Sequence, residues 1–210
     1  MKMRTNVADV YIARIPNELE VKRLSSDERN AYVEKTGNPA AKREKYFAWR
    51  LLEYALRKSL GIEISDLKFE KTASGRWITE GVEFSISHSE SAVAVAISDS
   101  PVGVDIEEIK KPRSERFANR LLSEDELSVY NTLVTDKKDS YLLGKWTARE
   151  AAFKSQHLSY FHPTEPLNAV GNILTDTVSI DGTMYVYSVS ADIKSEVRVI
   201  LNIKSEEITG

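Results

Sequence analysis

Residues 92–107 read AVAVAISDSPVGVDIE, and this stretch predicts two consecutive strands of a folded core. No polar residue interrupts residues 92–97, which is typical of a strand buried on both faces. The polar residues and the proline at positions 98–101 turn the chain, and residues 102–107 form the second strand. The second strand begins apolar and ends in carboxylates, so it is predicted to run from the core to a polar rim.

The chain before this stretch predicts a strand and helices. Residues 7–15 alternate as a strand does, and residues 25–28 are typical of a capped helix start with an acidic first turn. A long amphipathic helix is predicted over residues 40–60, after a break at 36–39, with Gly61 as its stop. Two short strands follow at residues 67–71 and 82–86, with a turn at Ser74-Gly75 between them.

The chain after this stretch is first helical and then strand-like. Helical spacing covers residues 114–122, 124–133 and 137–155, and strands are predicted at 178–180, 183–189 and 197–203, with a hairpin turn at Asp181-Gly182. The fold class is therefore α+β. We expect two similar halves, residues 1–103 and 104–210, each a small antiparallel sheet packed with helices.

Composition excludes several classes of protein. The 210 residues are 41% hydrophobic and 29% charged, as in a globular enzyme, and they include no cysteine, which excludes disulfide scaffolds, thiolate metal sites and a cysteine nucleophile. The three histidines, His88, His157 and His162, are too scattered for an imidazole metal cage. The formal net charge of −3 argues against a broad nucleic-acid footprint.

The sequence also bears on localisation. No run approaches the ~20 apolar residues of a membrane span. The basic start at residues 1–4 is followed by residues 7–15, which Asp9 and Arg14 interrupt, so a signal peptide is not expected. We expect a cytoplasmic protein.

Two carboxylates at the end of the second strand form a candidate metal site. Asp105 and Glu107 are two residues apart on a strand, so their side chains leave the same face, whereas Glu108 points the other way. A solvated strand end is the better reading of an isolated pair of this kind. Here the apolar residues Val102 and Val104 precede the pair, which shifts the interpretation toward a bound cation.

A second candidate lies in the helix around Glu150 and Lys154, which are one turn apart and share a face. An ordinary surface ion pair, worth roughly 0.2–0.5 kcal/mol, is the simpler reading of these two residues alone. The apolar residues 151–153 between them argue against a plain solvated face.

A third candidate is Ser85-Ile86-Ser87-His88-Ser89, read as a polar loop after a strand that could hold an anion. The alternative is a strand end with a surface histidine. Arg50, Arg76 and the cluster 42–45 could join such a site, although helix solvation is the preferred reading for 42–45. The sequence contains no glycine-rich phosphate loop, so side chains would have to hold any phosphate.

Taken in order, these three segments resemble the motifs of the 4′-phosphopantetheinyl transferase superfamily, in particular its two-halved, Sfp-type branch. That family carries an S-H-S segment, a G-V/I-D-x-E strand and a W/F-S/T-x-K-E-A/S-x-x-K helix. This chain has Ser87-His88-Ser89, Gly103-Val104-Asp105-Ile106-Glu107 and a helix that runs from Trp146 to Lys154.

The resemblance implies an activity and partners. It implies Mg²⁺-dependent transfer of the 4′-phosphopantetheine arm of coenzyme A to a serine of an acyl or peptidyl carrier protein, with release of adenosine 3′,5′-bisphosphate. It also implies a monomer with its active site between the halves. From the net charge and the lack of a long apolar run, we expect neither a nucleic-acid nor a membrane partner. A non-catalytic module that binds coenzyme A or a carrier protein, and an unrelated Mg²⁺ phosphohydrolase, are the alternatives.

The resemblance also implies site residues. Asp105, Glu107 and Glu150 would hold Mg²⁺, or Mn²⁺ in its place; Arg50, Arg76, Ser87, His88, Arg149 and Lys154 would bind the phosphates of coenzyme A. A few carboxylates plus substrate phosphates are a typical magnesium environment. Lys154 would act on the leaving group, and Glu150, or as second choice Glu126, would take the serine proton.

Two further expectations concern basic residues. Arg149 stands where the family usually has lysine, which keeps the charge but replaces a point charge by a planar fork. A basic patch for an acidic carrier protein is expected at Lys110, Lys111, Arg113, Arg116 and Arg120, with a solvated helix as the alternative.

Overall fold

The structure is a computed structural model that describes residues 6–73, 75–110, 114–161, 171–192 and 194–209. The expectations for residues 1–4, Ser74, Lys111, Arg113 and His162 fall outside these ranges.

The chain forms nine strands, six α-helices and one 3₁₀ turn in the described ranges. In chain order they are β1 (Val7–Arg14), α1 (Asp27–Glu34), α2 (Pro39–Leu60), η1 (Ile64–Asp66), β2 (Phe69–Lys71), β3 (Trp77–Thr79), β4 (Glu83–Ser89), β5 (Ala92–Ser98), β6 (Gly103–Glu108), α3 (Glu115–Leu121), α4 (Glu124–Thr132), α5 (Thr135–Ser155), β7 (Asn172–Ile180), β8 (Thr183–Ala191), β9 (Glu196–Ile200) and α6 (Ser205–Thr209). The predicted α+β class is confirmed. The short elements β3 and α6 were not predicted.

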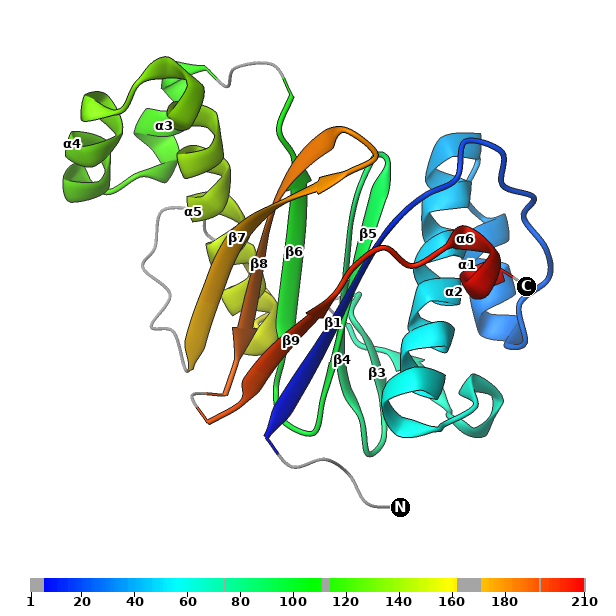
Figure 1. The fold of residues 1–210 in the computed structure, drawn as a ribbon. Coiled ribbons are helices and arrows are strands. Elements are labelled where there is room, and N and C mark those ends of the chain that lie inside the picture. The colour runs from blue at the N-terminus through cyan, green and yellow to red at the C-terminus, as the bar shows by residue number, and fades with distance from the viewer. Residues whose placement is uncertain (1–5, 74, 111–113, 162–170, 193, 210) are drawn as a thin grey trace.

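Two sheets form the centre of the molecule, and a long helix covers the outer side of each (Figure 1). The first sheet has the order β4-β5-β1-β9 and the second β6-β8-β7, while β2 and β3 form a separate two-stranded ribbon. One buried apolar cluster joins α2 to the first sheet, and another lies between the two sheets. Burial of these apolar faces is the main source of stability.

The last strand returns to the first sheet. β9 pairs with β1 in parallel, with Val7 opposite Glu196, whereas the other strand pairs are antiparallel as expected. Arg198 on β9 forms an ion pair with the buried Asp9 on β1. The C-terminal residues thus pack beside the N-terminal strand and cover its edge, which would otherwise expose unpaired backbone groups.

The ends of α2 follow the sequence closely. Asn38 caps the helix by accepting hydrogen bonds from the amides of Ala40 and Ala41, and Pro39 occupies the first helical position. Gly61 ends the helix in the left-handed conformation, with φ of 65°. The predicted start and stop of this helix are therefore confirmed.

Strand β7 is longer than predicted, and it also lies at an edge. It begins at Asn172, although only residues 178–180 were predicted as strand. Its first six residues are exposed, so they lack the apolar alternation by which a strand is recognised.

No helix of the described ranges is long and apolar enough to cross a membrane.

Gly103 lets β6 approach α5 closely. A Cβ atom at this position would lie 1.9 Å from the carbonyl oxygen of Ala151 and 2.7 Å from the amide nitrogen of Ser155. Both are backbone atoms of a helix, so they cannot move aside cheaply. We expect Gly103→Ala to lower the free energy of unfolding by about 3 kcal/mol or more, measured by urea denaturation.

Gly37→Ala is the matched control, because a Cβ atom there meets no atom within 4 Å. We expect that variant to change the free energy of unfolding by less than about 1 kcal/mol. Equal stabilities of the two variants would contradict the close approach of β6 and α5.

Candidate active site

Three serines of β4 connect the two sheets. The amide of Val104 donates to Ser85 Oγ at 3.0 Å, Ser87 Oγ donates to Asp105 Oδ1 at 2.6 Å, and the amide of Glu108 donates to Ser89 Oγ at 3.0 Å. Every second side chain of β4 therefore faces β6. The segment predicted as a polar loop is a strand, because it pairs with β5 along its whole length.

Asp105 is the buried centre of the site. Lys154 Nζ donates to its Oδ1 at 2.7 Å and to the carbonyl oxygen of Val104 at 3.1 Å. The other carboxylate oxygen, Oδ2, is buried and has no hydrogen-bond partner among the described residues. A buried carboxylate oxygen without a partner is costly, so this atom is suited to a ligand that the protein itself does not supply.

Helix α5 brings Glu150 to the same place as Lys154. Burial raises the pKa of Glu150 most; the ammonium of Lys154 lowers it and the carboxylate of Asp105 raises it, with a net increase. Glu107 follows two residues after Asp105 on β6 and is half-buried. The spacing thus gives Asp105 and Glu107 a common face, and it places Glu150 within the field of Asp105.

The predicted metal ligands do not form a closed cluster. Within the described part of the chain, no three histidine, aspartate or glutamate side chains gather closely enough to hold a metal ion. Here the ammonium of Lys154 balances Asp105, and three adjacent carboxylates would repel each other. The residues still suit Mg²⁺, because Oδ2 of Asp105 is unpartnered and one or two carboxylates plus substrate phosphates are enough for that ion.

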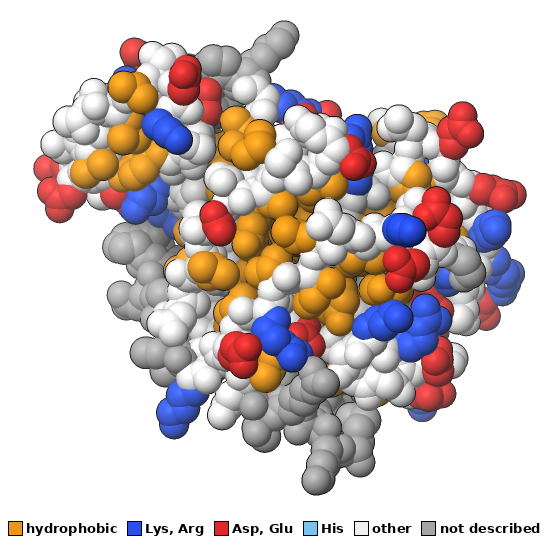
Figure 2. All heavy atoms as spheres, viewed as in Figure 1, with side chains coloured by type: hydrophobic (Ala, Val, Ile, Leu, Met, Phe, Trp, Pro, Cys, Tyr) orange, Lys and Arg blue, Asp and Glu red, His pale blue; other side chains and the backbone are white. Residues whose placement is uncertain are grey.

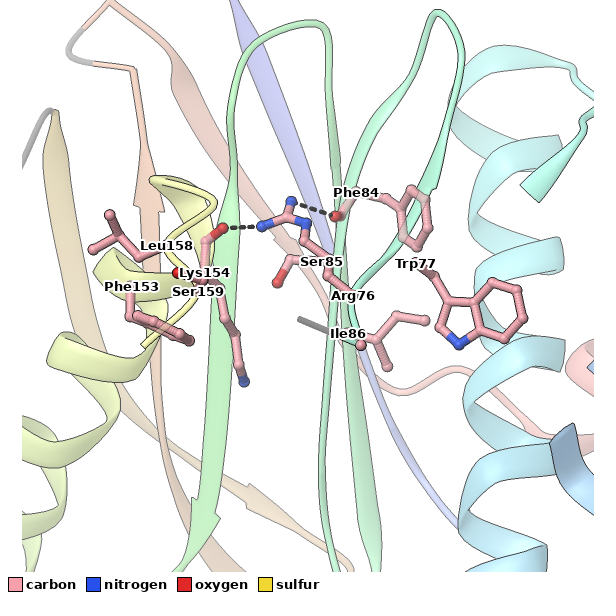
Figure 3. A pocket seen from close by; sticks show the side chains of 10 residues that line it. Arg76, Trp77, Phe84, Ser85, Ile86, Phe153, Lys154, Leu158 and Ser159 are labelled. Carbon is pink, nitrogen blue, oxygen red and sulfur yellow. Dashed lines mark hydrogen bonds between the residues drawn. The ribbon is translucent and has the colours of Figure 1, made fainter. Parts of the chain in front are cut away.

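A cavity of about 300 Å³ lies between β4 and the end of α5, and Lys154, which pairs with Asp105, is part of its lining. Its lining residues are Gly75, Arg76, Trp77, Phe84, Ser85, Ile86, Phe153, Lys154, Leu158 and Ser159. Figure 3 shows aromatic and aliphatic side chains from both sides of this space, with Lys154 and Arg76 among them. The cavity can therefore take a ligand with both an apolar and an anionic part.

Arg76 spans the cavity from strand β4 to helix α5. Its guanidinium donates to the carbonyl oxygens of Phe84, at 3.3 Å, and of Lys154 (Figure 3). Glu83 lies 3.7 Å from the same guanidinium. Burial lowers the pKa of Arg76, and Glu83 partly offsets that effect. The structure thus brings Arg76 together with Lys154.

His88 lies at the junction of β4 and α2. Its Nδ1 is 3.2 Å from Glu44 Oε2. Burial lowers the pKa of His88 most, Glu44 opposes this, and the ammonium groups of Lys154 and Lys45 lower the pKa further. Sequence reasoning interpreted Glu44 and Lys45 as part of a solvated helix. The spacing of Glu44 from Phe47 and Leu51, on the buried face of α2, could have identified it.

Arg50 lies apart from these residues, and the phosphate-binding role expected for it stays a prediction. Its Nε donates to the carbonyl oxygen of Ile208 at 3.1 Å, and its Nη1 is 2.7 Å from Glu53. Arg50 comes six residues after Glu44, which turns it about 240° around the helix, toward α6. Lys45, rather than Arg50, is the basic residue of α2 whose charge acts on His88.

Arg149 and Glu126 form an ion pair. The Nη2 of Arg149 lies 2.7 Å from Glu126 Oε2, and its Nη1 donates to the carbonyl oxygen of Leu121. Burial raises the pKa of Glu126, but the hydrogen bond from Ser123 and the charges of Lys145 and Arg149 outweigh it, so the pKa is lowered. The two acceptors of Arg149 make use of the planar fork that lysine lacks.

The comparisons with known proteins agree with this site. A model of the 4′-phosphopantetheinyl transferase superfamily matches residues 101–184, which include β6 and α5. Among curated proteins, the 4′-phosphopantetheinyl transferase psf-1 of Bacillus pumilus is 29% identical over 107 residues, which are 50% of this chain and 46% of that protein. The 4′-phosphopantetheinyl transferase gsp of Aneurinibacillus migulanus is 24% identical over 155 residues, 70% of this chain and 65% of that protein.

A holo-[acyl-carrier-protein] synthase of Streptococcus pyogenes is 34% identical over 58 residues, 25% of this chain and 49% of that protein. The matched part of the chain thus spans about half to two thirds of the length of these curated relatives. The first two relatives are named as 4′-phosphopantetheinyl transferases and the third as a holo-[acyl-carrier-protein] synthase. The chain is therefore similar to the 4′-phosphopantetheinyl transferase superfamily over residues 101–184, and to curated members of its Sfp-like branch.

Proposed function

We propose that this protein transfers the 4′-phosphopantetheine arm of coenzyme A to a serine of an acyl or peptidyl carrier protein and releases adenosine 3′,5′-bisphosphate. The observation that carries the proposal is the contact of Ser87, Asp105 and Lys154, one from each family motif, beside a cavity. Coenzyme A suits that cavity, because the wall is apolar and Arg76 and Lys154 supply positive charge.

The active site lies, in this proposal, between two pseudo-twofold halves that divide at residues 103 and 104. The layers support it, since each sheet carries one long helix on its outer side (Figure 1). The cavity draws Trp77 and Phe84 from the first half and Phe153 and Lys154 from the second. We also propose that the protein works as a monomer in the cytoplasm, as the family resemblance implies.

Asp105, Glu107 and Glu150 would hold Mg²⁺, with Mn²⁺ as an alternative. When bound, the ion would neutralise negative charge on the pyrophosphate of coenzyme A. The unpartnered Oδ2 of Asp105 is the first expected contact.

The side chains of this protein supply the rest of the chemistry. The carrier's serine oxygen forms a bond to the β-phosphorus of coenzyme A, and the bond from that phosphorus to the bridging oxygen breaks. Lys154 stabilises the negative charge on the leaving bisphosphate. Arg76, Ser87 and His88 bind phosphate oxygens, and Arg149 steadies the position of Glu126.

The serine proton goes to a carboxylate. We propose Glu150 for this role, because it lies on the same helix face as Lys154. Glu126 is the second choice: Ser123, Lys145 and Arg149 already donate to it or pair with it, so less of its basicity is available.

Analysis of the small-molecule product tests the proposed reaction. We expect adenosine 3′,5′-bisphosphate to appear in equal amount to modified carrier, with no inorganic phosphate, when products are separated by ion-exchange chromatography. Release of inorganic phosphate without modified carrier would overturn the proposal in favour of a phosphohydrolase. Coenzyme A binding without any product would overturn it in favour of a binding module.

Helix α3 is the proposed docking surface for the carrier protein. Arg116 and Arg120 are exposed and one turn apart on α3, so they share a face. Lys110 is instead paired with Glu90, so we assign docking to the two arginines. We expect Arg116→Glu with Arg120→Glu to raise KM for the carrier protein about tenfold and to leave KM for coenzyme A unchanged.

The matched control is Lys22→Glu with Lys35→Glu. Both lysines are exposed and flank α1, which Figure 1 places at the opposite end of the molecule from α3. This control changes the net charge by the same amount. If it raises KM for the carrier as much as the α3 variant does, docking depends on overall charge and not on α3.

A further inference from the structure

Arg29 is a buried cation that the proposed chemistry does not use. It lies on α1 and is 2% exposed. Its guanidinium carbon is 3.6 Å from the ring centre of Trp49 and 3.8 Å from that of Phe69. The planar cation therefore contacts both aromatic rings. Such contacts are attractive because the face of an aromatic ring is electron-rich.

The polar edge of Arg29 is unsatisfied. Its Nε and Nη2 are buried and have no hydrogen-bond partner within the described ranges. Burial lowers the pKa of Arg29 to about 9, opposed by Glu53 and Glu28 through space, so the group is still charged at neutral pH. A buried cation with two unsatisfied donors usually costs stability, so the effect of Arg29 on the rings around it is the better explanation for this residue.

Both aromatic neighbours of Arg29 contact rings that line the cavity. Trp49 contacts Trp77 edge-on, with ring centres 5.3 Å apart, and Phe69 contacts Phe84 edge-on at 5.7 Å. Trp77 and Phe84 line the cavity wall opposite α5, as Figure 3 shows. Each of the two rings that contact the guanidinium therefore touches one ring of the cavity wall.

We propose that Arg29 is a positioning residue for the coenzyme A cavity: it holds Trp49 and Phe69, and through them it fixes Trp77 and Phe84. This inference rests on the proposed function, because coenzyme A is taken as the occupant. Arg29 itself does not touch the ligand. In this proposal the chain keeps a buried cation with two unsatisfied donors because the flat group fixes two rings that an aliphatic side chain would leave free to tilt.

The test compares Arg29→Met with the wild-type protein in the transfer assay. Met fills a similar volume without charge or planarity. We expect KM for coenzyme A to rise about tenfold, kcat to change less than about threefold, and the melting temperature to stay equal or rise. The near-ultraviolet circular dichroism of the tryptophans should weaken, since Trp49 and Trp77 lose their fixed orientation.

Two more variants sharpen the result. Phe69→Leu keeps the charge of Arg29 but removes the ring that connects it to Phe84, while Trp49 still connects it to Trp77. This variant should therefore raise KM for coenzyme A by a smaller factor than Arg29→Met does, and it should lower kcat little. Arg57→Met, an exposed position on α2, should change neither KM nor the circular dichroism. Phe69→Leu keeps the test open if the Met variant does not fold.

An unchanged KM in a folded Arg29→Met protein would overturn the inference. A fall in kcat, a rise in KM and a fall in melting temperature that occur together would also overturn it, because they indicate only a structural role. If the wild-type protein itself transfers nothing, the proposed function fails instead, and the circular dichroism of Arg29→Met still reports whether Arg29 orders the rings.

Discussion

Replacement of Asp105 by alanine is expected to reduce arm transfer by about 1000-fold or more. Asp105 is buried, accepts hydrogen bonds from Ser87 and Lys154, and offers its unpartnered Oδ2 to a ligand. Its loss removes the expected metal contact and leaves the ammonium of Lys154 without its carboxylate. Steady-state transfer rates at saturating Mg²⁺ measure the effect, which added Mg²⁺ should not restore.

Glu108→Gln is the matched control for that variant. Glu108 lies on the same strand but alternates to the other face, where it accepts a hydrogen bond from Ser91. We expect its transfer rate to remain within about threefold of the wild-type rate. Wild-type activity in a folded Asp105→Ala protein would remove Asp105 from the site.

Replacement of Lys154 by methionine is expected to lower kcat about 100-fold or more, with a smaller change in KM for coenzyme A. Lys154 lines the cavity and its ammonium lies 2.7 Å from Asp105, so in the proposed reaction it would contact the leaving bisphosphate as its charge develops. A group that acts mainly in the transition state changes kcat more than KM. Single-turnover transfer from coenzyme A measures this step.

Lys137→Met controls for the loss of one lysine from α5, because Lys137 is exposed and lies more than three turns before Glu150. It should leave kcat unchanged. A rise in KM with unchanged kcat in Lys154→Met would show that Lys154 only binds the ground state, contrary to the role proposed for it.

Much of the fold was predictable because its long elements carry local signals. The apolar stripe and end residues of α2 define that helix, and the uninterrupted apolar run of β5 defines its strand. Partners between distant segments were not predictable in the same way. Alternation in the last strand indicates a strand, but it does not reveal the parallel pairing of β9 with β1, which depends on contacts between opposite ends of the chain.

The part of the candidate site that could be predicted from the sequence is the part whose motif residues lie on predicted elements. Asp105 and Lys154 lie close together because β6 and α5 pack through Gly103. The partners of Arg50 in this structure, Ile208 and Glu53, could not be predicted, since its position around α2 decides its neighbours and a basic residue on a helix gives no direction by itself. The effect of Lys45 on His88 was overlooked, because a cluster of charges in the sequence resembles a solvated helix face. Only the packing of α2 beside β4 reveals that Lys45 acts on His88.

The intact mass of an apo carrier protein incubated with this protein, coenzyme A and Mg²⁺ tests the central claim most directly. We expect the carrier to gain the mass of one phosphopantetheine arm, and we expect the gain to vanish with EDTA and in the Asp105→Ala protein. An unmodified carrier across several acyl and peptidyl carrier proteins, or a gain that persists in Asp105→Ala, would contradict the account.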